Sequence, residues 1–336
     1  MQAYELHDRK GLDSIFRVER GIPRPGPGQV LVRMRAWSLN YRDLLVAQGL
    51  YGRSSGEVIV PLSDGVGVVE ETGPGVTRVK AGERVAGAFL QDWIDGELTP
   101  EAAGSALGGG IDGVLAEYVV LQEHGLVRVP AHLSDAEAAC LPCAALTAWN
   151  ALVRESQLKA GDTVVLLGTG GVSLFGLQFA KMHGARALIT SSSDTKLELA
   201  RRMGADATVN YRATPDWPAA VREFTGGRGA DVVLEVGGAG TFDQSVSALR
   251  IGGRVCVIGV LAGISAPINT AAILGGLIRV SGIYVGSRAM FEEMNRAIAA
   301  ARMRPHIDRS FSFDEARAAY EHLAGAGHAG KVVIVA

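Results

Sequence analysis

The chain has 336 residues, of which 48% are hydrophobic and 20% charged, and its formal net charge at pH 7 is −2. This length suits two domains, and the composition is that of a globular protein with well-filled cores. The near-neutral charge balance excludes a basic face for nucleic acid, and no apolar run is long and uncharged enough to span a membrane. Three cysteines are too few for a secreted disulfide scaffold, so we expect a reduced, cytoplasmic location.

The first third of the chain is predicted to form β-strands. Residues 29–35 (QVLVRMR) alternate between apolar and polar, which is typical of a half-buried strand. Further strands are expected at residues 61–71, 84–89 and 113–121, and the turn residues between them predict a compact, barrel-like β domain. The polar, glycine-rich segment 91–112 is expected to be a loop.

From about residue 160 onward, short apolar runs alternate with helical stretches, which predicts a parallel, doubly wound sheet. The last expected strand, residues 331–335, is predicted to return to the N-terminal domain. The predicted division therefore assigns residues 1–125 and 287–336 to one domain and residues 126–286 to the other. The other expected strands are 163–167, 187–190, 232–236, 254–259 and 280–285, and the expected helices are 172–183, 195–203, 290–301 and 314–324.

A glycine turn, Gly168 to Ser173 (GTGGVS), follows the first strand of this second region and opens a helix. In this context a G-x-G-x-x-small pattern predicts a dinucleotide site, although a purely structural glycine turn is the alternative. Gly168 allows the tight turn, and Gly170 lets the backbone approach a pyrophosphate. Gly171 and Val172 begin the helix, whose N-terminus offers free N–H donors. Ser173 at the third position is small enough for the helix to pack on the strand.

The tip of the second strand indicates which nucleotide binds. Enzymes that use NAD usually carry an acidic residue there, whereas this chain has Ser191, Ser192 and Ser193, with Lys196 close by. Hydroxyls and a lysine suit a 2′-phosphate, so we expect NADPH. Asp194 is expected to cap the next helix; if it faces the cofactor instead, NADH is the nucleotide. The positions expected to contact the cofactor after the later strands are Tyr211, Gly237, Gly259 and Val285.

Several segments together are more specific than any single motif: residues 38–43 (SLNYRD), 48–51 (QGLY), 141–149 (LPCAALTAW), the glycine turn and 282–288 (GIYVGSR). On these segments the chain resembles the medium-chain dehydrogenase/reductase superfamily, and within it the zinc-lacking, quinone-oxidoreductase-like branch often labelled zinc-type alcohol dehydrogenase. The resemblance implies an α/β fold with a GroES-like, β-rich catalytic domain and a Rossmann domain with a doubly wound parallel sheet. It also implies a homodimer joined through the edges of the Rossmann sheets.

Zinc-dependent members of this superfamily hold catalytic zinc with a Cys, a His followed by Glu, and a second Cys. In this sequence those positions match Asn40, Ser63 followed by Asp64, and Cys143. Because catalytic zinc needs three protein ligands, we expect no zinc. Cys140-Leu-Pro-Cys143 is a C-x-x-C pattern and a redox dithiol is the alternative, but its apolar surroundings predict inert thiols.

The expected chemistry is hydride transfer from the nicotinamide to a quinone, an activated alkene or a carbonyl. Tyr51 matches the tyrosine that zinc-lacking enoyl reductases of the superfamily use beside the nicotinamide, so we expect it to donate a proton or hydrogen bond; the alternative is an aromatic residue that only lines the cleft. Asn40 is expected to orient the substrate or cofactor. The other residues expected in the substrate and nicotinamide pocket are Asp43, Asp64, Cys143, Thr147 and Tyr284.

Two other functions remain open from the sequence. One is an alcohol dehydrogenase that acts on a small alcohol or ketone. The other is a non-catalytic protein that binds NADPH.

Overall fold

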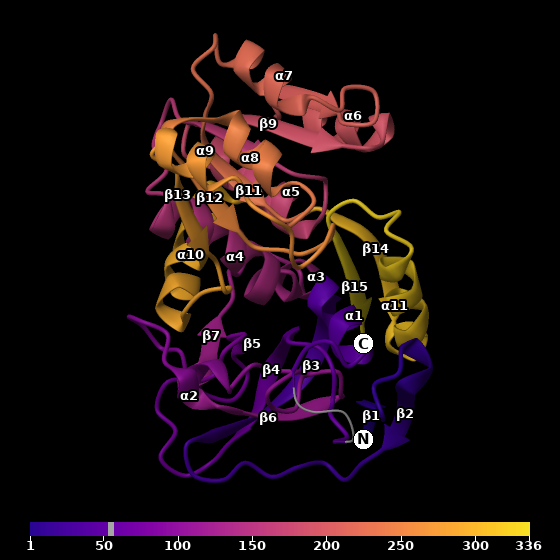
Figure 1. The fold of residues 1–336 in the computed structure, drawn as a ribbon. Coiled ribbons are helices and arrows are strands. Elements are labelled where there is room, and N and C mark those ends of the chain that lie inside the picture. Colours follow the sequence, from indigo (N-terminus) through magenta and orange to yellow (C-terminus); the bar gives the residue numbers. More distant parts are fainter. Residues whose placement is uncertain (53–56) are drawn as a thin grey trace. The chain divides into compact units, whose positions relative to one another are not determined.

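The computed structural model describes residues 1–52 and 57–336, which divide into two compact units (Figure 1). Unit 1 comprises Met1–Leu146 and Gly286–Ala336, and unit 2 comprises Thr147–Val285. The domain boundaries predicted from the sequence lie after residue 125 and before residue 287, so the first of them differs from the observed boundary after Leu146. The segment after residue 125 belongs with unit 1 because its strand β7 (Leu126–Arg128) pairs with β5 (Arg84–Gly87) and its helix α3 (Asp135–Ala139) packs on that unit's sheet.

Unit 1 is built on a seven-stranded sheet with the order β14-β15-β3-β4-β5-β7, and β6 also pairs with β3. The last strand of the chain lies between β14, to which it is parallel, and β3, to which it is antiparallel, so the predicted return to the N-terminal domain is confirmed. The bounds of these strands are β3 (Gln29–Leu39), β4 (Asp64–Thr72), β6 (Tyr118–Gln122), β14 (Ile307–Ser312) and β15 (Lys331–Val335).

Two of the predicted strands of unit 1 begin later than expected, β4 at Asp64 and β6 at Tyr118. The residues before them form hydrogen bonds with each other outside the sheet: the amides of Gly113 and Val114 donate to the carbonyls of Val60 and Leu62. The prediction that residues 91–112 form only a loop is wrong at one place. Helix α2 (Pro100–Ala103) forms there, with the Thr99 side chain accepting from the amide of Ala102.

The remaining elements of unit 1 surround this sheet, and Tyr320 and Trp37 are among the side chains buried in its core. The predicted helices near residues 290–301 and 314–324 are confirmed as α10 and α11. The bounds are β1 (Gln2–Leu6), β2 (Ile15–Glu19), α1 (Tyr41–Ala47), α10 (Arg288–Ala301) and α11 (Ala316–Ala324).

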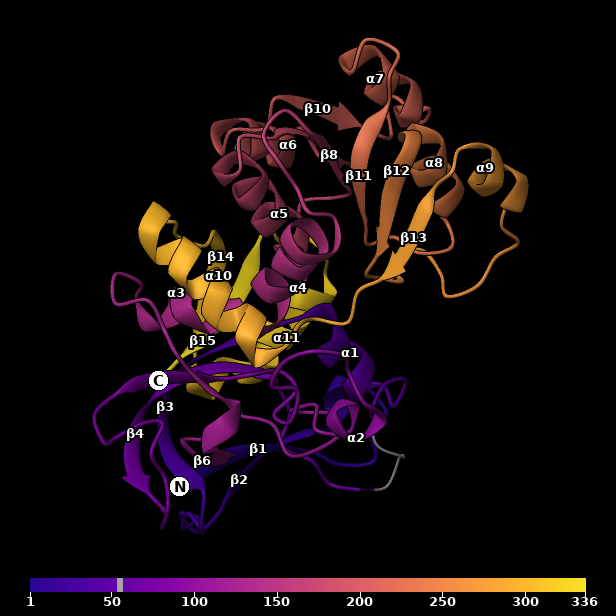
Figure 2. The same ribbon diagram turned by 90° about the vertical axis from the view of Figure 1, so that its left-hand side faces the viewer.

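Unit 2 has a six-stranded, wholly parallel sheet with the order β10-β9-β8-β11-β12-β13, which confirms the predicted doubly wound fold. Figure 2 shows β11, β12 and β13 side by side. The central strands β8 and β11 are buried along their whole length, as strands covered on both faces are, whereas the edge strand β13 is largely exposed. The bounds are β8 (Thr163–Leu166), β9 (Arg186–Ser191), β10 (Ala207–Asn210), β11 (Ala230–Glu235), β12 (Leu249–Val257) and β13 (Arg279–Gly282).

Helices connect successive strands, as parallel pairing requires. Two of them, α5 and α6, pack on β8, β9 and β10, whereas α8 packs on β11 and β12 and contacts α7. Their bounds are α5 (Gly171–Met182), α6 (Asp194–Arg202), α7 (Trp217–Phe224), α8 (Phe242–Ala248) and α9 (Thr270–Gly275). A helical run that the sequence did not predict precedes β8; it consists of a π turn (Leu141–Ala145), α4 (Leu146–Trp149) and a second π turn (Asn150–Glu155). In the part of the chain that the structure describes, no helix is long and apolar enough to cross a membrane.

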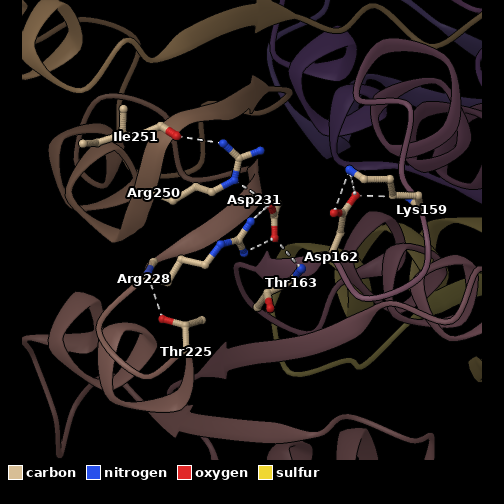
Figure 3. A network of polar contacts seen from close by, with 9 residues as sticks. Lys159, Asp162, Thr163, Thr225, Arg228, Asp231, Arg250 and Ile251 are labelled. Carbon is tan, nitrogen blue, oxygen red and sulfur yellow. Dashed lines mark hydrogen bonds and ion pairs between the residues drawn. The ribbon is translucent and has the colours of Figure 1, made fainter.

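A buried carboxylate holds the amino ends of two central strands of unit 2 together (Figure 3). Asp231 of β11 accepts hydrogen bonds from the amide of Thr163 in β8 at 2.8 Å, from both terminal nitrogens of Arg228 and from Nε of Arg250. Burial raises the pKa of this carboxyl, but the hydrogen bonds from the two arginines and the amide outweigh that effect and lower the pKa to about 2. The ionised form therefore stabilises unit 2.

We expect Asp231→Asn to lower the free energy of unfolding at pH 7 by about 1–3 kcal/mol, because two guanidinium groups lose their carboxylate. Because folding depresses the pKa of Asp231, the difference between wild type and variant should be complete above about pH 4 and should vanish as the pH falls towards 2. Urea denaturation between pH 7 and pH 2.5 measures this. Glu223→Gln, at an exposed position of α7, is the control, and an equal loss in both variants would contradict the prediction.

Candidate active site

Asn40 follows the last residue of β3 and is the N-cap of α1. Its amide donates to Oδ2 of Asp43 at 2.8 Å, and Nη1 of Arg42 donates to the other oxygen at 3.1 Å. Asp43 is 1% exposed, and burial raises its pKa to about 6 although Arg42 opposes the shift. The carboxyl of Asp43 thus fixes the start of α1 and holds the backbone of Asn40.

The side chain of Lys331 lies beside Asn40, a contact that the sequence analysis missed. Lys331 is the first residue of β15 and is 3% exposed. Its Nζ donates to the carbonyl of Leu39 at 2.7 Å and to Oδ1 of Asn40 at 2.5 Å, and it lies 4.0 Å from Oδ2 of Asp64. The sequence carried no signal for this position, because a lysine at the end of a predicted strand usually faces solvent.

Asp64, the first residue of β4, is fully buried at the same place. Its Oδ1 accepts from the hydroxyl of Ser63 at 2.7 Å, and its Oδ2 accepts from the amide of Cys143 at 3.1 Å. Burial raises the pKa of Asp64, and Lys331 opposes the shift. The fold therefore brings together Asn40, Asp64 and Cys143, three of the positions that match zinc ligands.

These residues do not fit a zinc ion. An amide, a hydroxyl and a carboxylate stand beside one thiol whose pKa burial raises above its usual range, and no imidazole is among them. An ammonium group also lies within the cluster. Among the described residues, no group of three His, Cys, Asp or Glu side chains is placed to hold a metal ion.

The C-x-x-C pattern forms no disulfide, and its thiols are free. Cys140 is buried and directs its Sγ at the carbonyl of Ala136 at 3.2 Å. Burial raises the pKa of the Cys140 thiol to about 12. At neutral pH the thiol is therefore protonated and a poor nucleophile, as the sequence predicted.

Tyr51 is half-buried and packs against the core of unit 1. The guanidinium carbon of Arg42 lies 5.0 Å from the centroid of its ring, and 4.9 Å from that of Phe89. Nη1 of Arg42 also donates to the carbonyl of Leu107 at 2.9 Å. Arg42, another residue that the sequence analysis missed, thus links Asp43 with Tyr51.

In unit 2 the residues expected at the cofactor all lie at one edge of the sheet. The strands are parallel, so their carboxyl ends meet at that edge. The strand order reverses at β8, and the glycine turn follows β8 at this switch point, where open α/β sheets bind their ligands. Ser191 is the last residue of β9. The residues that follow the ends of the strands are Ser192 and Ser193 after β9, Tyr211 after β10, Gly237 after β11, Gly259 after β12, and Tyr284 and Val285 after β13.

The glycine turn has the local geometry that a pyrophosphate needs. Gly168 has φ +71°, which favours glycine, and Gly170 is the N-cap of α5 with no heavy atom within 4 Å of where a Cβ would stand. Ser173 donates its hydroxyl to the carbonyl of Leu167 at 2.7 Å. The close approach of helix and sheet occurs at Gly176, where a Cβ would stand 2.8 Å from Cδ2 of Leu166.

The tip of β9 differs from the prediction in one respect. The N-cap of α6 is Ser193, whose hydroxyl accepts from the amide of Lys196, so the expectation that Asp194 is the cap is wrong. The helix begins one residue earlier than predicted, and Asp194 instead accepts from Nδ2 of Asn210 at 2.8 Å. The hydroxyl of Ser191 accepts from the amide of Ser193 at 3.3 Å. Both serine hydroxyls keep their own hydrogen for donation to an anion.

Val285 has φ +52°, which is strained for a β-branched residue. Nδ2 of Asn150 donates to its carbonyl at 2.9 Å and holds this conformation. Thr147, which is buried, lies three residues before Asn150 in the same helical run and hence on the same helical face. Strained backbone of this kind is concentrated at functional sites, and Asn150 was missed because its partner is far away in the sequence.

Two known protein families match the two parts of the chain. Residues 26–131 match the family model of the alcohol dehydrogenase GroES-like domain, and residues 171–300 match that of zinc-binding dehydrogenases. A zinc-type alcohol dehydrogenase-like protein of Schizosaccharomyces pombe is 43% identical over 339 residues, which cover 98% of each chain. The chain belongs to the medium-chain dehydrogenase/reductase family. It is therefore an oxidoreductase, of a family that binds nicotinamide cofactors.

Solved structures of this family show which cofactors similar proteins bind. One described as an NAD-dependent alcohol dehydrogenase has a TM-score of 0.91 and 32% identity, with 100% of each chain covered. A 2-octenoyl-CoA carboxylase reductase in complex with NADP and 2-octenoyl-CoA has a TM-score of 0.89 and 27% identity, with 99% of this chain and 87% of that chain covered. The family therefore includes proteins with either nucleotide.

Proposed function

We propose that this protein is an NADPH-dependent, zinc-independent reductase that transfers a hydride to a quinone, an activated alkene or a carbonyl. The observation that carries the proposal is the cluster of Asn40, Asp64 and Cys143 around the ammonium of Lys331, whose donors do not fit zinc. Without a Lewis acid, hydrogen-bond donors must stabilise the charge that develops on the acceptor, and this is easiest for acceptors that are already electron-poor. The resemblance of the whole chain to a carboxylase reductase in complex with an enoyl thioester supports this substrate class.

The choice of NADPH rests on the tip of β9. The hydroxyls of Ser191 and Ser193, with Lys196 beside them, are suited to a 2′-phosphate. Asp194 follows Ser193 in the chain, and its hydrogen bond from Asn210 directs its carboxylate to β10. NADH remains the alternative, since one similar structure is described as NAD-dependent.

Gly170→Val should leave the fold intact but weaken NADPH binding at least tenfold, because the added side chain would fill the open space that a pyrophosphate needs. Fluorescence titration with NADPH and NADH measures the affinities. Gly176→Ala is the matched control: its methyl group meets buried Leu166 and Leu234, so it should lower the free energy of unfolding by about 1–3 kcal/mol and leave nucleotide affinity nearly unchanged. An unchanged affinity of the Gly170 variant for NADPH would show that the glycine turn does not contact the nucleotide.

The chain's own residues must orient the substrate and stabilise the negative charge that develops on its oxygen. When bound, NADPH supplies the hydride. We propose that the phenol of Tyr51 donates a hydrogen bond or proton to the developing enolate or alkoxide, and that Asn40 contributes its carboxamide N–H. The half-buried ring of Tyr51 rests against the guanidinium of Arg42, which limits its movement.

Tyr51→Phe should lower kcat about tenfold to a hundredfold with an enone and have little effect with 1,4-benzoquinone, which is reducible without a protein acid. NADPH consumption by chelator-treated protein measures both. Turnover that survives the chelator supports the reductase, whereas activity only after zinc is added would favour the alcohol dehydrogenase. Binding of NADPH without turnover of any acceptor would favour a non-catalytic role.

We also propose that the protein is a homodimer joined through the β13 edges of two Rossmann sheets. β13 is the last strand of its sheet, and apolar side chains lie exposed on it and on the segment before it. Ile264 is 86% exposed and Leu274 78%. A monomer rarely exposes such a group of large apolar side chains.

Leu274→Glu should convert the dimer to a monomer, because the change places a charge in the interface at a side chain that is 78% exposed in the single chain. Sedimentation velocity at several protein concentrations measures the mass. Glu223→Lys, at an exposed position of α7, is the control for an altered surface charge. A wild-type protein that sediments as a monomer at all concentrations would contradict the proposal.

A further inference from the structure

The ammonium of Lys331 lies where three candidate ligand positions meet. It contacts Asn40 directly, it is 4.0 Å from Asp64, and Asp64 in turn accepts from the backbone of Cys143. We propose that Lys331 is a built-in cation that occupies the space between Asn40, Asp64 and Cys143 and excludes a divalent metal ion from it. This inference deepens the proposed zinc-independent function and rests on it.

The charges of the buried cluster already balance. Asp43 is paired with Arg42 at 3.1 Å, and Asp64 has Lys331 at 4.0 Å. All four side chains are at least nine-tenths buried, so water screens their charges poorly. A divalent ion would add two positive charges next to the ammonium, with no anion left to offset them. Electrostatics therefore opposes metal binding even before the ligands are considered.

The hydrogen bonds within the cluster also use the oxygen atoms that a metal ion would need as ligands. Two of the three ammonium hydrogens are used by the carbonyl of Leu39 and by Oδ1 of Asn40. Oδ1 is the atom of Asn40 that a metal ion would bind, and it is occupied. The hydroxyl of Ser63 likewise donates to Asp64. The side-chain oxygens of Asn40, Ser63 and Asp64 thus each take part in a hydrogen bond or an ion pair.

The position of Lys331 follows from the pairing of the strands. Val332 is opposite Leu39 in the antiparallel pair of β15 and β3, so the residue before Val332 lies beside Asn40. Val332, Val333 and Ile334 are fully buried, which fixes β15 in register. The backbone pairing thus fixes where the side chain of Lys331 begins, and the hydrogen bonds to Leu39 and Asn40 hold its ammonium in the cluster.

The first test is a metal titration that uses no substrate, so its result does not depend on whether the protein has the proposed reductase activity. Chelator-treated wild-type protein is titrated with Co²⁺, whose thiolate charge-transfer band reports on Cys143. We expect no such band. A band that appears with one equivalent of Co²⁺, and is absent in Cys143→Ala, would overturn the inference whatever the reductase assay shows.

The second test restores the zinc ligands with and without the ammonium. Variant N40C/S63H keeps Lys331, N40C/S63H/K331M removes its charge at similar length, and N40C/S63H/K331R retains a cation. Zinc affinity is measured by competition with a chromophoric chelator. We expect the K331M triple variant to bind zinc at least 100-fold more tightly than the other two, with one zinc per chain. Equal affinities in all three would overturn the inference, and the wild-type titration decides the question if the K331M chain does not fold.

Discussion

The pairing of β15 with β3 is the interaction on which the rest of unit 1 depends. It joins the last residues of the chain to the N-terminal sheet by antiparallel hydrogen bonds, and it buries Val332, Val333 and Ile334 completely. The same register places Lys331 beside Asn40. The fold of unit 1 and the chemistry of its buried cluster therefore have one cause, because a shift of one residue would move the lysine to the other face of the strand.

A second constraint shapes unit 2. Parallel strands direct all their carboxyl ends to one edge, so loops that are up to about 120 residues apart in sequence meet there. The positive φ of Gly168 allows the turn from β8 into α5 at this edge, and Gly176 allows α5 to pack closely on Leu166 and Leu234 of the sheet. The ion pairs of Asp231 stabilise the opposite ends of β8 and β11, away from the proposed cofactor site. The residues that stabilise unit 2 and those proposed to bind the cofactor thus lie at different ends of the same strands.

Elements that depend on interactions between residues close in sequence were predicted accurately, and those that depend on distant residues were not. The strands at residues 163–167 and 331–335 and the helix at 172–183 were predicted to within a residue or two, because apolar runs and glycine turns are local signals. The starts of β4 and β6 were misplaced, since hydrogen bonds between residues about 50 positions apart decide them. Asp194 was assigned as a cap although Ser193 has that role; both residue types are good caps, and the backbone conformation selects between them.

The sequence by itself determined the two-part α/β architecture and the glycine turn, because each depends on which residues stand next to one another in the chain. Only the tertiary structure decided that Lys331 lies beside Asn40 and Asp64. Lys331 is 291 residues from Asn40, and nothing near it in the sequence distinguishes it from a lysine at the exposed end of a strand. The burial of Lys331 and the hydrogen bond from Asn150 to Val285 both depend on strand register and packing. These arise only when segments that are distant in sequence come together.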